Sequence, residues 1–308
     1  MSEREPPVTV VVLNWNGRDD SEACLASLQQ VTYDNVRVIL VDNGSTDGSV
    51  AYLRERFADV TFIVNDRNLG FAEGNNVGIR RALEEDAAWV LLLNNDTTVE
   101  PDFLTKLVDA VRRDETIGII GPRLNRYDPS DRVWFAGGRV CLWSGWTWHT
   151  GNHATDRGQF TGLVDEDYQT GAAMMLRRDV LKRVGVLDAD YVSYFEDNDL
   201  CVRAKSAGFR VVCCCDAKVY HKVSASTGGG LTPHKAYRKI LSGARFFRTH
   251  AGPFRYYTTI AAFNAAYAAA TVLLETLRGK FSVVGAIFRG FVDLFRGRDR
   301  DRDMLKSE

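Results

Sequence analysis

The chain has 308 residues, of which 45% are hydrophobic and 26% charged, and its formal net charge is −1. This composition is that of an ordinary globular protein, and the length suits one large domain with an accessory segment. A nearly neutral chain has no overall attraction to a polyanion, so we expect no nucleic-acid partner. Residues 1–7 lack the apolar stretch of a secretory signal, so we expect the main domain to stay in the cytoplasm.

The first 120 residues alternate short apolar runs with amphipathic helical patterns. Each run is continuous and rich in β-branched residues, as in a strand covered on both faces. Strands that alternate with helices over short loops predict a mostly parallel, doubly wound α/β sheet. Such sheets bind ligands at the carboxyl ends of their strands, so we take the residues after each run as candidate site residues. The runs are Val8–Leu13, Val36–Val41, Val60–Val64, Trp89–Leu93 and Ile117–Ile120.

Polar motifs follow the first two runs. The first, NWNG at residues 14–17, is neither GxGxxG nor a P-loop, which disfavours a Rossmann dinucleotide site and a P-loop nucleotide site. The second begins at Asp42 in DNGSTD. A carboxylate that leaves a buried strand can accept hydrogen bonds from a base or a ribose. Thr46 or Asp47 of this motif can also serve only to cap the next helix.

Asn94, Asn95 and Asp96 follow the fourth run and bring two amides and one carboxylate to one place. A diphosphate leaving group needs a hard divalent cation, and such cations take oxygen ligands. One carboxylate leaves coordination positions for phosphate oxygens and water. A simple turn is the alternative explanation of the same three residues.

Two further motifs occur late in the chain. Glu196 and Asp197 follow an aromatic pair at the expected start of a helix. Acids there stabilise the positive end of the helix, but a carboxylate there can also act as a general base on a hydroxyl. His221 follows the last expected strand, where a neutral imidazole can reach a metal or a phosphate; a structural role is the alternative.

The stretch 122–169 loses the strand–helix rhythm, and we expect a long irregular functional loop there. It holds four of the six tryptophans, which can stack on sugar rings or simply pack the loop: Trp134, Trp143, Trp146 and Trp148. Regular structure is expected again from residue 171. Three consecutive cysteines, 213–215, alternate faces in an expected strand and are interpreted as small core residues.

Taken in order, seven motifs resemble those of the inverting family 2 nucleotide-sugar glycosyltransferases, in their rhamnosyltransferase-like branch. The resemblance runs from Val8 to about Ser226. It implies a GT-A fold, a Rossmann-like mostly parallel sheet flanked by helices, with a nucleotide-binding half and an acceptor-binding half. The motifs are VVVLNWNG, VDNGSTDGS, NLGFAEGNN, LLLNNDTTVEPDFL, TGAAMMLRRDVL, YFEDNDLCVRAKSAGF and VYH.

The resemblance also implies roles for single residues. Asp197 matches the catalytic base, with Glu196 as the second candidate. Asp96 and His221 match the metal and diphosphate site, and Mg²⁺ or Mn²⁺ is the implied cofactor. Asn94 and Asn95 stand where other branches carry acids. The implied donor-binding residues are Asn14, Asp42, Asn68, Gly70, Asn75, Asn94 and Asn95.

The implied reaction is a single in-line displacement on a nucleotide-sugar donor, in which Asp197 takes the acceptor proton and the configuration inverts. A non-catalytic, glycosyltransferase-like binding or scaffold protein is the alternative. It is disfavoured because Asp96 and Asp197 are both present. A nucleotidyltransferase is disfavoured because no Gly-rich, Arg-containing loop follows the first run.

We expect a main domain at residues 1–222 and a second segment at 223–308, with a flexible Ser, Thr and Gly-rich link near 222–230. No acidic residue occurs from Ala217 to Leu274, whereas eight Lys or Arg do. This basic segment is expected to be attracted to anionic lipid. The residues concerned are Lys235, Arg238, Lys239, Arg245 and Arg248.

The end of the chain is apolar. Residues 256–274 are uncharged but rich in alanine, so they are marginal for spanning a hydrocarbon core of ~30 Å. Five residues then recur at intervals of three and four and predict one apolar helix face, with Ser282, Arg289 and Asp293 opposite. Such a helix can lie in a membrane interface. The five are Phe281, Val284, Phe288, Phe291 and Phe295.

We therefore expect an enzyme on the cytoplasmic face of the cell membrane, held there by a peripheral or marginally inserted C-terminus. A glycan or lipid-linked acceptor, such as a polyprenyl or dolichyl phosphate carrying sugars, fits this position. A helical hairpin packed on the main domain or on another subunit is the alternative for the C-terminal segment.

Overall fold

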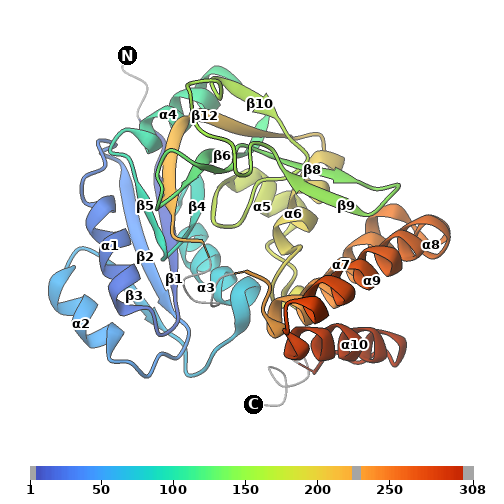
Figure 1. The fold of residues 1–308 in the computed structure, drawn as a ribbon. Coiled ribbons are helices and arrows are strands. Elements are labelled where there is room, and N and C mark those ends of the chain that lie inside the picture. The colour runs from blue at the N-terminus through green and yellow to red at the C-terminus, as the bar shows by residue number, and fades with distance from the viewer. Residues whose placement is uncertain (1–4, 224–229, 301–308) are drawn as a thin grey trace.

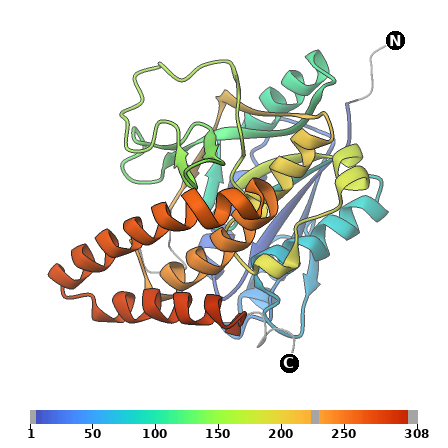
Figure 2. The same ribbon diagram turned by 90° about the vertical axis from the view of Figure 1, so that its right-hand side faces the viewer.

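The structure is a computed structural model that describes residues 5–223 and 230–300. A twisted sheet flanked by helices forms the main body, and three long C-terminal helices lie together at one side of it (Figures 1 and 2). They are α7 (Pro233–Ala251), α9 (Ala261–Leu277) and α10 (Phe281–Phe295). The predicted link falls largely within 224–229, outside the described residues, so the domain boundary stays a prediction.

The main sheet is mostly parallel, as predicted. β1 (Val8–Asn14) lies between β2 (Val36–Asp42) and β4 (Trp89–Asn94), and all three run parallel. β3 (Thr61–Val64) continues this half beside β2. In the other half, β6 (Ile117–Arg126) runs parallel to β12 (Arg210–His221).

One antiparallel strand, β11 (Ala173–Arg177), joins the two halves by pairing with both β4 and β6. In the described sheet the order is β10-β12-β6-β11-β4-β1-β2-β3, with β5 on β12 and β7 on β6. The short strands are β5 (Thr97–Val99), β7 (Val133–Phe135) and β10 (Leu163–Asp165). Because β11 is reversed, its first residues lie where the parallel strands end.

The helices of the main domain bury one apolar side against the sheet. α4 follows the predicted pattern: Phe103, Leu104, Leu107, Val108 and Val111 are all buried. The core is dominated by the strands, whose apolar residues are covered on both faces. The helices are α1 (Arg18–Leu28), α2 (Ser49–Arg56), α3 (Gly70–Glu84), α4 (Phe103–Arg113), α5 (Arg178–Val184) and α6 (Glu196–Ser206).

The stretch 122–169 is more regular than the sequence predicted. β6 continues to Arg126, β7 and β10 join the main sheet, and β8 (Gly138–Cys141) pairs with β9 (Trp146–His149) as a separate ribbon. The prediction of one long irregular loop is therefore wrong. The four strands have only three or four residues each, which is too short to produce a recognisable period in the sequence.

The three consecutive cysteines of β12 are core residues, as predicted. Cys213, Cys214 and Cys215 are buried and carry free thiols. The sulfurs of Cys213 and Cys215 lie 3.8 Å apart, as expected for side chains two residues apart on one strand face.

The C-terminal helices differ in how far they are buried. α7 packs on the main domain, where Phe246 and Phe247 form a buried cluster with Tyr191. α10 packs on α7 through Val283 and Ile287. α9 continues from the short α8 (Pro253–Arg255) and a π-helical turn (Tyr256–Ile260), and most of its surface is exposed. Within the described residues, 253–277 is the one helical stretch long and apolar enough to cross a membrane.

Several charged residues of this segment do not lie where the sequence predicted. Lys235 and Arg238 are buried, with 8% and 0% exposure. Arg245 forms ion pairs with acids of the main domain. The prediction that all five basic residues face lipid is therefore wrong, although Lys239 and Arg248 are exposed.

Asp293 was expected on the outer polar face of its helix, but it is fully buried. It accepts a hydrogen bond from the Tyr237 hydroxyl at 3.1 Å and pairs with Arg300 at 2.7 Å. A buried carboxylate is tolerated here because both partners satisfy it. The aromatic face is consequently turned outward: Phe281, Phe288 and Phe295 are 68%, 60% and 89% exposed.

Glu166, just after β10, is a buried carboxyl group with one cation beside it. Arg139 Nε lies 3.2 Å from its Oε2, and within the described residues neither oxygen accepts a well-formed hydrogen bond. Burial raises the pKa of Glu166 to about 7, and the charge of Arg139 opposes this shift. The folded protein therefore holds this proton more tightly than the unfolded chain does.

We expect this group to make folding stability fall as pH rises from about 4.5 to about 7, and then level off. Glu166→Gln removes the ionisation, so the decline should be smaller in the variant. Chemical denaturation of both proteins at about pH 5 and about pH 8 measures the difference. An equal decline in the two proteins would show that Glu166 is not its source.

Candidate active site

The polar residues predicted to form the site converge at the edge of the sheet where its parallel strands end. The ends of β1, β2 and β4 carry Asn14, Asp42 and Asn94; Asn14 lies opposite Asp42, and Asn94 lies opposite Leu13. Asp96 follows β4, and His221 is the last residue of β12. The topology therefore brings together residues from both halves of the chain.

Asn14 is the centre of a buried hydrogen-bond network. Its Nδ2 donates to Asp42 Oδ1 at 2.7 Å, and its Oδ1 accepts from Ser21 Oγ at 2.8 Å and Asn95 Nδ2 at 3.3 Å. Asp42 also accepts from the Ser45 backbone N–H at 2.8 Å and hydroxyl at 2.6 Å. Asn14 and Asp42 are 0% and 1% exposed. These contacts hold the ends of β1, β2 and β4 together; direct contact with a nucleotide stays a prediction.

The predicted donor segment forms the loop that leads into α3. Asn68 Oδ1 accepts from the Gly70 N–H at 2.8 Å and from Asn43 Nδ2 at 3.2 Å. Gly70 has φ +78°, a conformation that favours glycine. Asn75 is buried inside the helix and donates to Phe71 O at 2.9 Å. Asn68 and Gly70 thus shape the loop, whereas Asn75 secures the first turn of α3.

Asn94 differs from the other predicted donor-binding amides. Its backbone N–H donates to Ala172 O at 2.9 Å, but within the described residues its side chain forms no hydrogen bond. The side chain is half-buried at the edge of the sheet. Its amide is therefore free to bind a ligand.

Asp96 and His221 are brought together by the pairing of β5 with β12, which places His221 opposite Thr97. His221 Nε2 lies 3.1 Å from Asp96 Oδ1, and the two side chains are 6% and 7% exposed. In the described structure His221 Nδ1 has no hydrogen-bond partner, and the contact of His221 Nε2 with Asp96 Oδ1 lacks the geometry of a hydrogen bond. Buried polar atoms without partners need an explanation, and a carboxylate beside an imidazole is a donor set that suits a divalent cation.

The charge state of Asp96 fits this use. Burial would raise the pKa of Asp96, but neighbouring His221 and Lys222 hold the pKa below its ordinary value. The carboxylate is therefore ionised at neutral pH. Among the residues that the structure describes, no group of three or more His, Cys, Asp or Glu could hold a metal by itself.

Glu196 and Asp197 begin α6 but face different surroundings. Asp197 is half-buried, and its two oxygens accept from the N–H groups of Gly171 at 2.9 Å and Asn198 at 2.8 Å. Glu196 is 5% exposed. Burial raises the pKa of Glu196, and the charge of Asp197 raises it further. Burial also raises the pKa of Asp197, although both N–H groups oppose the shift.

The bend before these acids has an unusual backbone. Val192, Tyr194 and Phe195 have φ values of +62°, +65° and +69°. Residues other than glycine rarely adopt a positive φ. This backbone conformation costs about 1–3 kcal/mol a residue and persists only where the surroundings impose it. On one side, Val192 O accepts from the Phe71 N–H at 3.0 Å. The donor segment and the acidic pair are therefore physically connected.

α7 holds the bend from the other side. The buried Arg238 guanidinium and the Ser242 hydroxyl both donate to Tyr191 O. Near the end of α7, His250 Nε2 lies 2.8 Å from Asp199 Oδ1 in α6. The sequence did not predict this supporting role for Arg238, Ser242 or His250. The available signal was the spacing of Arg238 and Ser242, which places two polar groups on one face of a largely apolar helix.

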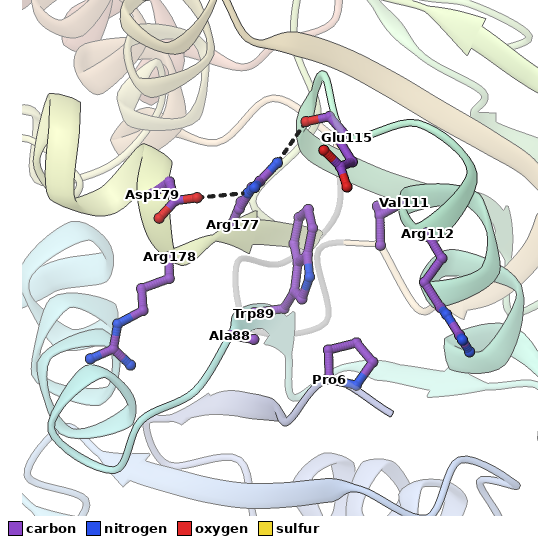
Figure 3. Close-up of a pocket in the computed structure, with 9 residues that line it drawn as sticks. All are labelled: Pro6, Ala88, Trp89, Val111, Arg112, Glu115, Arg177, Arg178 and Asp179. Carbon is purple, nitrogen blue, oxygen red and sulfur yellow. Dashed lines mark hydrogen bonds and ion pairs between the residues drawn. The ribbon is translucent and has the colours of Figure 1, made fainter. Parts of the chain in front are cut away.

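Two pockets of the described residues lie elsewhere. Figure 3 shows one of about 280 Å³ between Pro6, Trp89, Val111 and Arg177, where β4 begins and β11 ends. This is the opposite edge of the sheet from the polar cluster. A second pocket is lined by residues of α1, β2 and β3. Neither is lined by a predicted site residue, so we place the candidate site by its chemical groups.

We expect Asn14→Ala and Asn94→Ala to differ in stability. The first change removes one hydrogen-bond partner each from Asp42, Ser21 and Asn95, and a buried group left unsatisfied costs about 1–3 kcal/mol. The second removes a side chain without hydrogen bonds and should change the free energy of unfolding by less than about 0.5 kcal/mol. Urea denaturation measures both. Equal losses would contradict the central role of Asn14.

Comparison with known proteins identifies one family. The Glycosyl transferase family 2 model matches residues 9–185. An N-acetylglucosaminyl-diphospho-decaprenol L-rhamnosyltransferase of Mycobacterium tuberculosis is 30% identical over 74% of this chain and 80% of its own. The dTDP-rhamnosyl transferase RfbF of Shigella flexneri is 25% identical over 64% of each chain.

Solved structures show the same fold. A mannosyltransferase from Pyrobaculum calidifontis, in complex with GDP-Man and Mn²⁺, matches 96% of this chain and 89% of its own, with a TM-score of 0.60 and 19% identity. GalNAc-T7 with UDP, GalNAc and Mn²⁺ matches 82% of this chain and 52% of its own, with a TM-score of 0.60 and 15% identity. The predicted GT-A fold is confirmed. The chain belongs to glycosyl transferase family 2 and is a glycosyltransferase.

Proposed function

We propose that the enzyme transfers a sugar from a nucleoside-diphosphate donor to a lipid-linked glycan acceptor, with inversion and with the help of a divalent cation. One observation carries this proposal: the segment before β11 connects the donor side to the acidic pair. The Ala172 carbonyl accepts from the Asn94 N–H, while the neighbouring Gly171 N–H donates to Asp197 Oδ2 at 2.9 Å. A candidate base thus lies next to the strand end that leads to Asp96.

Asp96 and His221 would hold Mg²⁺ or Mn²⁺, and oxygens of the donor diphosphate and water would complete its coordination. When bound, such a cation neutralises charge on the departing diphosphate. The two solved structures named above both contain Mn²⁺. Asn94 faces the donor, while the network around Asn14, Asp42 and Asn95 keeps the strand ends in place.

Asp197 is the proposed base because its environment suits proton transfer. Its two oxygens are oriented by backbone N–H groups, and it is more accessible than the buried Glu196. A raised pKa brings a carboxylate closer to the pH at which it must accept a proton. Removal of the acceptor proton by Asp197 allows direct attack on the anomeric carbon, so the configuration inverts in one step.

The Mycobacterium tuberculosis relative is named for a diphospho-decaprenol substrate, and this supports a lipid-linked acceptor here. The outward aromatic face of α10 and the exposed apolar α9 support attachment to the cytoplasmic face of a membrane. A non-catalytic scaffold is the less favoured alternative because the candidate base and the candidate metal ligands lie at one sheet edge.

Asp96→Asn should abolish sugar transfer with little effect on folding, because the change keeps the size of a side chain outside the apolar core. Loss of cation stabilisation by several kcal/mol corresponds to at least about a hundredfold slower turnover. Transfer from a panel of UDP-, GDP- and dTDP-sugars measures the effect, with thermal unfolding as the control for fold. A chelator should reproduce the loss in the wild type, and added Mg²⁺ or Mn²⁺ should reverse it. Full activity in excess chelator would rule out the cation.

Asp197→Asn should reduce turnover by roughly 10²–10⁴-fold, because the amide keeps the shape but cannot accept the proton. Donor affinity, measured by calorimetry, should change no more than a few-fold. The matched variant Glu196→Gln, at the neighbouring position, should reduce turnover less. If Glu196→Gln is the more damaging of the two, the base has been assigned to the wrong acid.

A further inference from the structure

The ribbon formed by β8 and β9 carries exposed tryptophans that the proposed reaction does not use. Trp143 in its turn is 61% exposed, and Trp146 and Trp148 on β9 are 41% and 44% exposed. Trp146 and Trp148 are two residues apart, so they lie on the same face of the strand. Large aromatic groups that gather on one exposed face mark an interaction surface more often than chance exposure does.

The ribbon is attached to the C-terminal helices. The Trp146 ring meets Phe263 and Tyr267 of α9 edge-on, with centroids 5.8 Å and 5.5 Å away. Gly145, at the turn, has φ +75°, and a Cβ there would lie 2.6 Å from the Ile260 side chain. The turn can approach the helix this closely only because residue 145 is glycine.

Trp143 adds two further contacts at the same place. The Arg255 guanidinium lies 4.0 Å from its ring centroid, and the Thr259 hydroxyl donates to its carbonyl oxygen at 2.9 Å. The ribbon turn and the beginning of α9 therefore form one continuous surface. Figure 1 shows the ribbon reaching from the sheet toward α8 and α9, and Figure 2 shows it beside the same helices.

The charges of this combined surface have one sign. Residues 138–149 contain no acid, and residues 253–297 contain only Glu275 and Asp293. Both acids are buried, with 2% and 0% exposure, and both are paired with arginines. Cations, among them Arg289 and Arg296, are exposed on α10 and just after it. The surface is thus aromatic, apolar and positively charged.

We infer that the β8–β9 ribbon docks into an anionic bilayer interface together with α8–α10, with Trp143 and Trp146 at the headgroup level. The inference rests on the proposed membrane attachment and extends it to an element far from the C-terminus in sequence. Tryptophan is enriched at membrane interfaces because one part of its ring system is apolar and another donates a hydrogen bond. Anionic lipid attracts the exposed cations. A second copy of the same face would instead bring like charges together.

The other end of the ribbon connects this surface to the candidate site. His149, the last residue of β9, lies 4.9 Å from Trp134 between ring centroids, and Trp134 lies 4.6 Å from His221. The ribbon therefore extends from the proposed lipid contact to the edge of the proposed cation site. With its turn in the bilayer interface and its other end beside the proposed cation site, the ribbon would set the height of that site above the bilayer. The sugar of a lipid-linked acceptor is presented at this height.

The test uses the full chain and phosphatidylglycerol–phosphatidylcholine vesicles, some with brominated acyl chains that quench nearby tryptophans. Quenching of wild-type fluorescence should be strong and should fall markedly in Trp143→Phe/Trp146→Phe, where Trp148 is the one exposed tryptophan left on the ribbon. In a flotation assay Trp143→Ala/Trp146→Ala should weaken vesicle affinity roughly tenfold, because interfacial burial of the two aromatic side chains is lost. Val64→Ser, which changes an exposed residue of β3, the last strand on the other side of the described sheet, should leave affinity unchanged.

A second probe does not depend on tryptophan. Cys141, at the end of β8, is half-buried, whereas the other five cysteines are buried. A polarity-sensitive thiol dye on Cys141 should shift its emission to the blue when anionic vesicles are added. Thermal unfolding of each variant confirms that the ribbon substitutions leave the fold intact.

The outcomes separate this inference from the proposal on which it rests. In one outcome wild-type protein binds vesicles and Phe288→Ser/Phe295→Ser weakens binding, but the tryptophan substitutions do not change affinity or quenching and the dye emission does not shift. In that case the helices bind the membrane without the ribbon, and the ribbon inference is overturned. If wild-type protein does not bind anionic vesicles at low salt, membrane attachment and the ribbon inference both fail. Concentration-dependent dimerisation in that case, measured by sedimentation, would identify a second copy as the occupant.

Discussion

The hydrogen bond from Asn14 to Asp42 is the contact on which the rest of the site depends. A carboxylate at 1% exposure is expensive to bury unless donors satisfy it, and Asn14 and Ser45 supply those donors. Because Asn14 also accepts from Asn95, the same side chain joins three parallel strand ends. The polar edge beside these ends is therefore oriented by its own hydrogen bonds, and preorganised groups need little reorganisation when charge develops near them.

The acidic pair depends on a second constraint, the bend of residues 192–195, in which Val192, Tyr194 and Phe195 have positive φ. A valine and two aromatic residues do not adopt this conformation by preference. Phe71 at the start of α3 and Arg238 and Ser242 in α7 impose it through hydrogen bonds to neighbouring carbonyls. A change in the donor loop or in α7 can therefore reach Asp197 without touching it, because the bend connects all three.

This connection changes the role of the C-terminal segment. α7 supports the bend and contributes buried cations, whereas α9 and α10 present apolar and positively charged surface. The segment thus has an inner layer that orients the proposed base and an outer layer suited to lipid. Since α10 packs directly on α7, the proposed membrane contact and the bend are separated by a single layer of helix.

Patterns in the sequence were enough to predict the parallel strands up to β6, the buried side of α4, the core cysteines and the family, because each rests on local periodicity or on ordered motifs. It named Asp96 and His221, but only the pairing of β5 with β12 set them 3.1 Å apart. Tertiary structure alone decided that Asn14 and Asn95 point into a network while Asn94 does not. The burial of Arg238 and Asp293 and the contact of the β8–β9 ribbon with α9 are likewise seen only in the tertiary structure. These features depend on contacts between residues far apart in the chain, and local patterns of hydrophobicity and charge carry no information about such contacts.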